Sequence, residues 1–127
     1  MNWLWVALGG AIGASLRYGT SVWLIKPQGD FPWATWSVNL LGCFCAGLFF
    51  ACSQKYPYLQ QEARLFLMVG ILGGFTTFSS FGLETFQLLK QQQLALALIY
   101  VVSSVICGVL LLALAYYLTS RALNTWL

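Results

Sequence analysis

The chain has 127 residues, of which 60% are hydrophobic and only 7% are charged. A water-soluble domain carries about a quarter charged residues, so this composition excludes an ordinary soluble fold and predicts an integral membrane protein. The net charge of +3 comes from basic residues spread singly along the chain, which excludes nucleic acid as a partner because such a partner needs basic residues clustered on one face.

Four apolar segments are each long enough to cross a bilayer, which takes about 20 residues. They predict an all-α fold of four transmembrane helices in a single membrane domain, residues 1–127, with spans at about 3–24, 33–52, 63–89 and 94–118. Turn chemistry predicts the loops between them, at Lys26–Asp30, at the polar Ser53–Glu62 and at Lys90–Gln93.

The first span combines small residues with a buried charge. Gly9 and Gly13 are spaced so that a neighbouring backbone can approach closely, and Arg17 lies on the same broad face. A charged side chain at the centre of a span costs about 3 kcal/mol. Arg17 therefore either extends to the interface or supplies positive potential to a water-filled vestibule, and the composition leaves both open.

The second span has Asn39 at its middle, and Thr35 lies one turn away on the same face. A buried asparagine is often a hydrogen-bonding link between membrane helices, worth about 1–2 kcal/mol. Pointed into a cavity, its amide hydrogens are instead neutral donors suited to a small anion. Both interpretations stand at this point.

The third span contains the strongest signal, the glycine-rich and hydroxyl-rich run Gly73–Phe81. Two glycines followed by threonines and serines make a poor helix interior, so the run predicts a broken helix. Freed carbonyls at such a break can coordinate a small cation. The alternative is a regular helix in which Gly70 and Gly74 form a packing face and the hydroxyls bond to the preceding turn.

Aromatic and polar residues continue along the third and fourth spans. Phe78 and Phe81 share a face and alternate with hydroxyls, and their positive ring edges could stabilise an anion without trapping it, although such rings are more often packing bulk. Tyr100 and Ser104 share a stripe that could extend a polar track with Glu84, or could simply pack. The four cysteines are expected to be free, buried thiols.

The loop charges bear on orientation. Lys55, Arg64 and Arg121 are on the side that carries both termini, and Lys26 and Lys90 are on the other. Three against two is almost no positive-inside bias. It predicts insertion in both orientations, and hence an antiparallel homodimer with its two-fold axis in the membrane plane.

Three runs in order, Gly9–Tyr18, Val38–Gly42 and Gly73–Phe81, resemble the Fluc (CrcB-type) fluoride channels, and the resemblance covers the whole chain. It implies a multi-pass, dual-topology homodimer in the inner membrane of a bacterial cell. Such a dimer exports fluoride passively through two antiparallel pores.

The resemblance also implies roles for individual residues. Asn39, Phe78 and Phe81 would line the fluoride path, and Arg17 would face the vestibule. Backbone carbonyls of Gly73 and Thr76 from both subunits would hold a central structural sodium. The other members of the polar track would be Thr35, Ser79, Ser80, Glu84, Tyr100 and Ser104. Gly108 stands where some relatives carry a hydroxyl residue.

Other classes of protein fit less well. A small proton-coupled multidrug-type transporter would want a membrane-embedded acid in the first span, and this chain has none there; Glu84, in the third span, is its only candidate. A purely structural membrane subunit gives the hydroxyl run no purpose. An enzyme is disfavoured because the sequence has no histidine and only three acidic residues.

Overall fold

The computed structural model describes residues 1–24 and 30–125. Lys26 and most of the predicted first loop lie outside these residues. All regular structure within them is helical, in the order α1 (Asn2–Trp23), α2 (Trp33–Lys55), η1 (Pro57–Gln60), η2 (Arg64–Leu72), α3 (Gly73–Phe75), α4 (Phe78–Lys90) and α5 (Leu94–Thr125).

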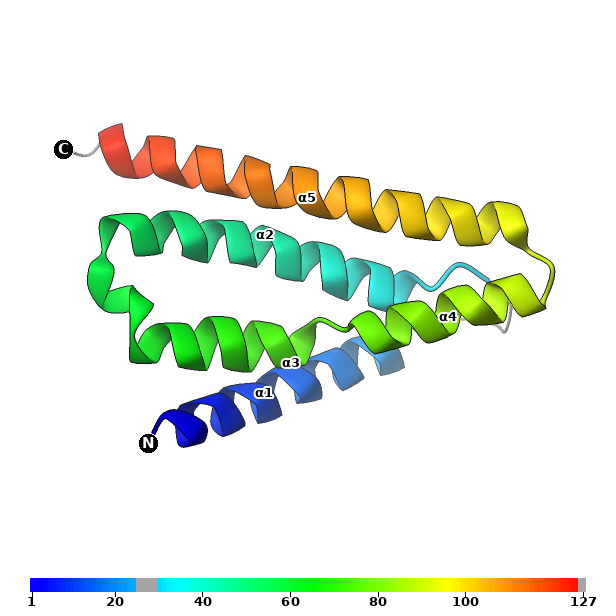
Figure 1. Cartoon of the computed structure of the whole chain (residues 1–127), viewed down its shortest axis with the longest axis horizontal. Coiled ribbons are helices and arrows are strands. Elements are labelled where there is room, and N and C mark those ends of the chain that lie inside the picture. The colour runs from blue at the N-terminus through cyan, green and yellow to red at the C-terminus, as the bar shows by residue number, and fades with distance from the viewer. Residues whose placement is uncertain (25–29, 126–127) are drawn as a thin grey trace.

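The helices lie lengthwise beside one another (Figure 1). The N-terminus, the turn between α2 and η2 and the last turn of α5 gather at one end, drawn on the left, and the α4–α5 turn lies at the other. This is the arrangement that four passes of the chain produce.

Three stretches are long and apolar enough to cross a membrane, namely Trp33–Lys55, Arg64–Lys90 and Leu94–Asn124. In the described part of the chain α1 does not join them, although it has 22 residues. Its tryptophans, glycines and hydroxyl residues dilute its hydropathy. The structure thus supports the second, third and fourth predicted spans, and the first span, at residues 3–24, stays a prediction.

Helices α2 and α5 extend beyond the carboxyl ends of the spans that the sequence predicts. The second span was expected to end near Cys52 and the fourth near Leu118, but α2 continues to Lys55 and α5 to Thr125. The Lys55 ammonium donates a hydrogen bond to the Leu123 carbonyl. A cation at the carboxyl end of a helix stabilises its last turn, so α5 outlasts its apolar run.

The predicted interruption of the third span is present but narrower than Gly73–Phe81. Gly73 is helical, with φ −62° and ψ −37°. Extended backbone is confined to Thr76 (φ −81°, ψ 158°) and Thr77 (φ −151°, ψ 124°). The break therefore falls on the threonines, whose β-branched side chains suit extended backbone. The alternative prediction, a regular helix through this run, is therefore wrong.

The glycines of this region serve packing instead. A Cβ added at Gly70 would lie 2.8 Å from the Gly9 Cα, and one at Gly74 would lie 2.6 Å from the Gly10 carbonyl oxygen. At Gly13 a Cβ would overlap the Ile71 carbonyl oxygen. The small residues of α1 thus face those of η2 and α3. The alternative interpretation was right that Gly70 and Gly74 form a packing face.

All four cysteines are free, as predicted. Cys43, Cys45, Cys52 and Cys107 are each half-buried along α2 and α5.

Gly13→Ala should destabilise the chain by about 1–3 kcal/mol, because the added methyl group overpacks a backbone contact that cannot move aside. Gly19→Ala is the matched control, since a Cβ at Gly19 meets nothing within 4 Å. Thermal unfolding in detergent measures the difference. Equal melting temperatures for the two variants would contradict the close α1–η2 contact.

Candidate functional site

Asn39 of α2 pairs with the extended backbone of Thr77. The Thr77 N–H donates to Asn39 Oδ1 at 2.9 Å, and Asn39 Nδ2 donates to the Thr77 carbonyl oxygen at 3.1 Å. The Asn39 carboxamide thus supplies the acceptor that the Thr77 N–H loses at the break, and it adds a second donor to the Thr77 carbonyl, which as the N-cap carbonyl already accepts the first bond of α4. An unpaired backbone group in hydrocarbon costs several kcal/mol, so Asn39 is what makes the break tolerable inside a membrane.

Thr77 also restarts the helix. Its hydroxyl accepts a hydrogen bond from the Ser80 N–H at 3.2 Å and lies 3.3 Å from the Ser79 hydroxyl. This is the N-cap arrangement, which satisfies one of the donors left over at a helix start. Sequence reasoning gave Thr77 no role of its own. The available signal was a threonine, a preferred N-cap residue, directly ahead of the apolar Phe78.

Because the N–H groups of Thr77 and Ser80 bond to side-chain oxygens, two backbone carbonyl groups lose the donors that a continuous helix would give them. In a continuous α-helix the Thr77 N–H would bond to the Gly73 carbonyl and the Ser80 N–H to the Thr76 carbonyl. Here they bond to Asn39 Oδ1 and Thr77 Oγ1 instead. Gly73 is also exposed on the single chain. Backbone carbonyls freed in this way can ligate Na⁺, so the donor set fits the predicted cation.

A cavity of about 270 Å³ opens between α1, α2 and α4. Its polar lining consists of Arg17, Tyr18, Ser21, Thr35, Thr77, Ser80 and Glu84. Four residues that the sequence singled out, on three different helices, therefore meet in one space. Arg17 contributes a guanidinium group to it and Glu84 contributes a carboxyl group.

Hydroxyl groups hold the Glu84 side chain. Thr35 Oγ1 donates to Glu84 Oε1 at 2.6 Å, and the Tyr100 hydroxyl donates to Glu84 Oε2 at 3.4 Å. Thr35 and Tyr100 are buried. The carboxyl is therefore fixed at the edge of the cavity by α2 and α5, although it is carried by α4.

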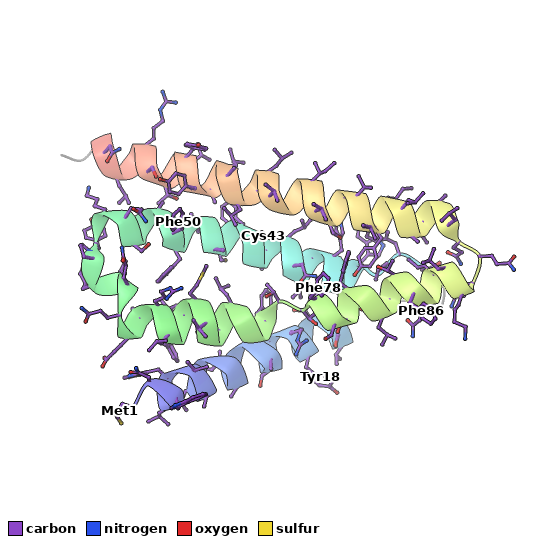
Figure 2. The ribbon with its side chains drawn as sticks, viewed as in Figure 1. Met1, Tyr18, Cys43, Phe50, Phe78 and Phe86 are labelled. Atoms are coloured by element: carbon purple, nitrogen blue, oxygen red, sulfur yellow. The ribbon has the colours of Figure 1, made fainter. Side chains whose placement is uncertain are left out.

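A chain of aromatic rings leads away from the break. The Phe78 and Phe81 ring centroids are 5.7 Å apart, and the Phe81 and Tyr100 centroids are 5.0 Å apart. Phe78 lies at the start of α4 (Figure 2) and is 83% exposed. In the single chain, one side of this aromatic path is open.

A second cavity, of about 380 Å³, lies on the other side of the break. Asn39, Gly73, Thr76 and Phe78 line it, together with Thr77, which also lines the first cavity. The two cavities thus meet at Thr77, one of the two extended residues of the break.

Some predicted site residues are not brought together. Ser104 Oγ is buried, and no partner for it is found within the described ranges. Ser79 is exposed near the break. Gly108 packs under Cys43, so that a Cβ added there would lie 3.2 Å from the Cys43 sulfur. The predicted polar track is therefore discontinuous in the single chain.

Comparisons of the sequence with known proteins find a matching family and similar chains. Residues 4–116 match the family model described as CrcB-like protein, Camphor Resistance (CrcB). A Thermus thermophilus protein named fluoride-specific ion channel FluC is 50% identical over 118 residues, which is 92% of each chain. Proteins of the same name from Methylobacillus flagellatus and Helicobacter acinonychis are 38% and 42% identical, and the alignments cover more than nine-tenths of each chain.

Asn39→Leu should lower the stability of the chain by about 1–3 kcal/mol, because it leaves the Thr77 N–H without an acceptor inside the membrane. The isosteric Thr76→Val is the control, since the Thr76 hydroxyl only bonds back to the Leu72 carbonyl of its own helix. Unfolding by denaturing detergent measures both. If Asn39→Leu is as stable as Thr76→Val, Asn39 does not support the break.

Proposed function

The chain belongs to the CrcB family, and from that premise we propose that it is a fluoride-selective channel that lets fluoride leave the cytoplasm passively. The relatives described above are named as ion channels, and the chain is not an enzyme. The observation that carries the proposal is the broken third helix, where Asn39 holds Thr77 beside Phe78. The proposed location is the inner membrane of a bacterial cell.

The polar groups at the break suit a small, strongly hydrated anion. Fluoride must exchange its water for short hydrogen bonds from neutral donors. Asn39 Nδ2 uses one of its two hydrogens on the Thr77 carbonyl, which leaves the second for an anion. The Ser80 hydroxyl lines the adjoining cavity. Chloride is larger and gains less from such short contacts.

The aromatic residues suit conduction rather than tight binding. Phe78 and Phe81 present polarised ring edges and carry no full charge. An anion that passes ring edges is attracted weakly, and conduction requires binding weak enough for the ion to leave.

A second copy of the chain would complete the path. Phe78 is 83% exposed and Gly73 is exposed, so the single chain supplies only one wall of the space at the break. An antiparallel homodimer with a two-fold axis in the membrane plane would supply the opposite wall twice and produce two antiparallel pores. The balanced loop charges support insertion in both orientations.

The same dimer would bring two sets of freed carbonyls together. Gly73 and Thr76 of each subunit would hold a central structural sodium ion. The bound ion would supply a positive charge that offsets the converging carbonyl dipoles and links the two broken helices.

One observation favours a second candidate, a small proton-coupled multidrug-type transporter. Glu84 lies within a candidate span, and two hydroxyl groups hold its carboxyl beside a cavity. A proton-coupled carrier needs such an acid. The requirement for a proton gradient separates the two candidates.

Liposomes that contain only this protein test the proposal. Loaded with potassium fluoride and given a potassium ionophore, they should release fluoride without any proton gradient and should retain chloride. A fluoride-selective electrode measures the release. Absence of release, or release that needs a proton gradient, would overturn the channel assignment.

Phe78→Ile should reduce fluoride release at least about tenfold while the dimer persists, since the aliphatic side chain removes the polarised ring edge. Phe86→Ile is the matched control, because Phe86 is an exposed ring farther along the same helix (Figure 2). Equal rates for the two variants would remove Phe78 from the path.

Removal of sodium tests the cation site separately. Purification with N-methylglucamine in place of sodium should lower the melting temperature of the dimer, because the ion would no longer offset the Gly73 and Thr76 carbonyls. Readdition of sodium should restore it, and N-methylglucamine chloride at the same ionic strength is the control. An unchanged dimer would argue against a structural sodium.

A further inference from the structure

A third cavity, of about 270 Å³, opens where α2 ends and η2 begins. Its polar lining comes from the side chains of Ser53, Gln54, Gln60 and Arg64, and its floor is formed by Phe49, Phe50 and Met68. Gln60 Nε2 donates to the Ser53 carbonyl at 2.9 Å, which holds η1 against the end of α2. The elements that line it, the end of α2 and the start of η2, lie at the same end of the molecule as the N-terminus and the last turn of α5 (Figure 1).

This cavity is the outer end of a groove that leads to the break. One wall is a single stripe of α2, at Asn39, Cys43, Ala46, Phe50 and Gln54. The facing wall is a single stripe of η2 and its continuation, at Arg64, Met68, Leu72 and Thr76. Positions three or four apart lie on one face of an α-helix such as α2, and positions four apart stay close to one face of the wider π-helix η2, so each wall is a stripe along its helix. Met68 lines the cavity at each end of the groove.

Three cavities therefore lie in series. We call the first cavity the Arg17 cavity, the second the cavity at the break and the third the Arg64 cavity. Thr77 lines both the Arg17 cavity and the cavity at the break. Met68 lines both the cavity at the break and the Arg64 cavity. An arginine stands at each outer end of the series. The stretch between Arg64 and the break is apolar, with Leu72 and Leu112 beside Met68.

The Arg64 side chain is suited to attract anions. Arg64 is exposed, and its guanidinium is paired with no carboxylate in the part of the chain that the structure describes. Guanidinium remains charged at any physiological pH and offers five N–H donors. Gln54 and Gln60 add carboxamide donors without adding negative charge.

We propose that the Arg64 cavity is the second mouth of the conduction path, a site that gathers small hydrated anions, including fluoride, at the end opposite the Arg17 cavity. This inference rests on the proposed channel function. The charge at the mouth raises the local anion concentration, and selection takes place farther in, at Asn39 and Phe78. Met68 and Leu72 form the apolar constriction between the two.

Salt dependence tests the mouth. Initial fluoride efflux is measured from vesicles of neutral phosphatidylcholine in potassium gluconate at about 10 mM, where the Debye length is about 30 Å, and at about 0.15 M, where it is about 8 Å. Arg64→Gln should lower the rate about threefold at the lower concentration and less than about 1.5-fold at the higher, because salt screens electrostatic recruitment.

Three further variants sharpen the result. Arg64→Lys keeps the charge and should retain the wild-type rate. Gln54→Glu should reproduce the salt-dependent loss from a different residue of the mouth, and it carries the test if Arg64→Gln does not assemble. Lys90→Gln removes an equal charge from the exposed end of α4, outside the lining of the three cavities, and any change in rate that it causes should be the same at both concentrations.

If Arg64→Gln lowers the fluoride efflux rate equally at both salt concentrations, Arg64 has a merely structural role. If it lowers the rate at neither concentration, the cavity lies outside the conduction path. Either result overturns the proposal. If the wild type conducts fluoride, these failures concern the mouth alone. If it releases no fluoride, the proposed function fails and this inference fails with it.

Discussion

The structure depends on one constraint, that a backbone which leaves the helix inside a membrane must find new hydrogen-bond partners. Water is not there to supply them, and each unpaired group costs several kcal/mol. Asn39 meets this constraint from a different helix, with one donor and one acceptor on the same carboxamide. A hydroxyl side chain has its donor and its acceptor on a single oxygen atom, and an ionised side chain offers either acceptors alone or donors alone.

The arrangement of the proposed site follows from how that constraint is met. Because the Thr77 N–H bonds to Asn39 and the Ser80 N–H bonds to the Thr77 hydroxyl, the carbonyls of Gly73 and Thr76 lose their helical donors. The same break makes a new helix begin at Phe78. One exchange of partners therefore yields both the freed carbonyls that suit a cation and the aromatic face that suits an anion.

The glycine contacts explain why the first helix matters although it is not among the candidate membrane spans. Gly9 and Gly13 bring α1 against η2 and α3 at backbone distance, and this places Arg17 over the cavity that Thr35 and Glu84 line. An arginine thus lines each of the two outer cavities, Arg17 together with Glu84 in one and Arg64 with carboxamide side chains in the other.

The sequence by itself determined the membrane class, three of the spans and the existence of the break, because hydropathy and the poor helix propensity of Gly73–Phe81 are local properties. It did not determine that the glycines stay helical while Thr76 and Thr77 extend, because the deciding partner, Asn39, is 38 residues away. Nor did it pair Thr35 with Glu84, which are 49 residues apart. Tertiary structure decided those features, since a hydrogen bond between distant segments exists only once the helices have packed.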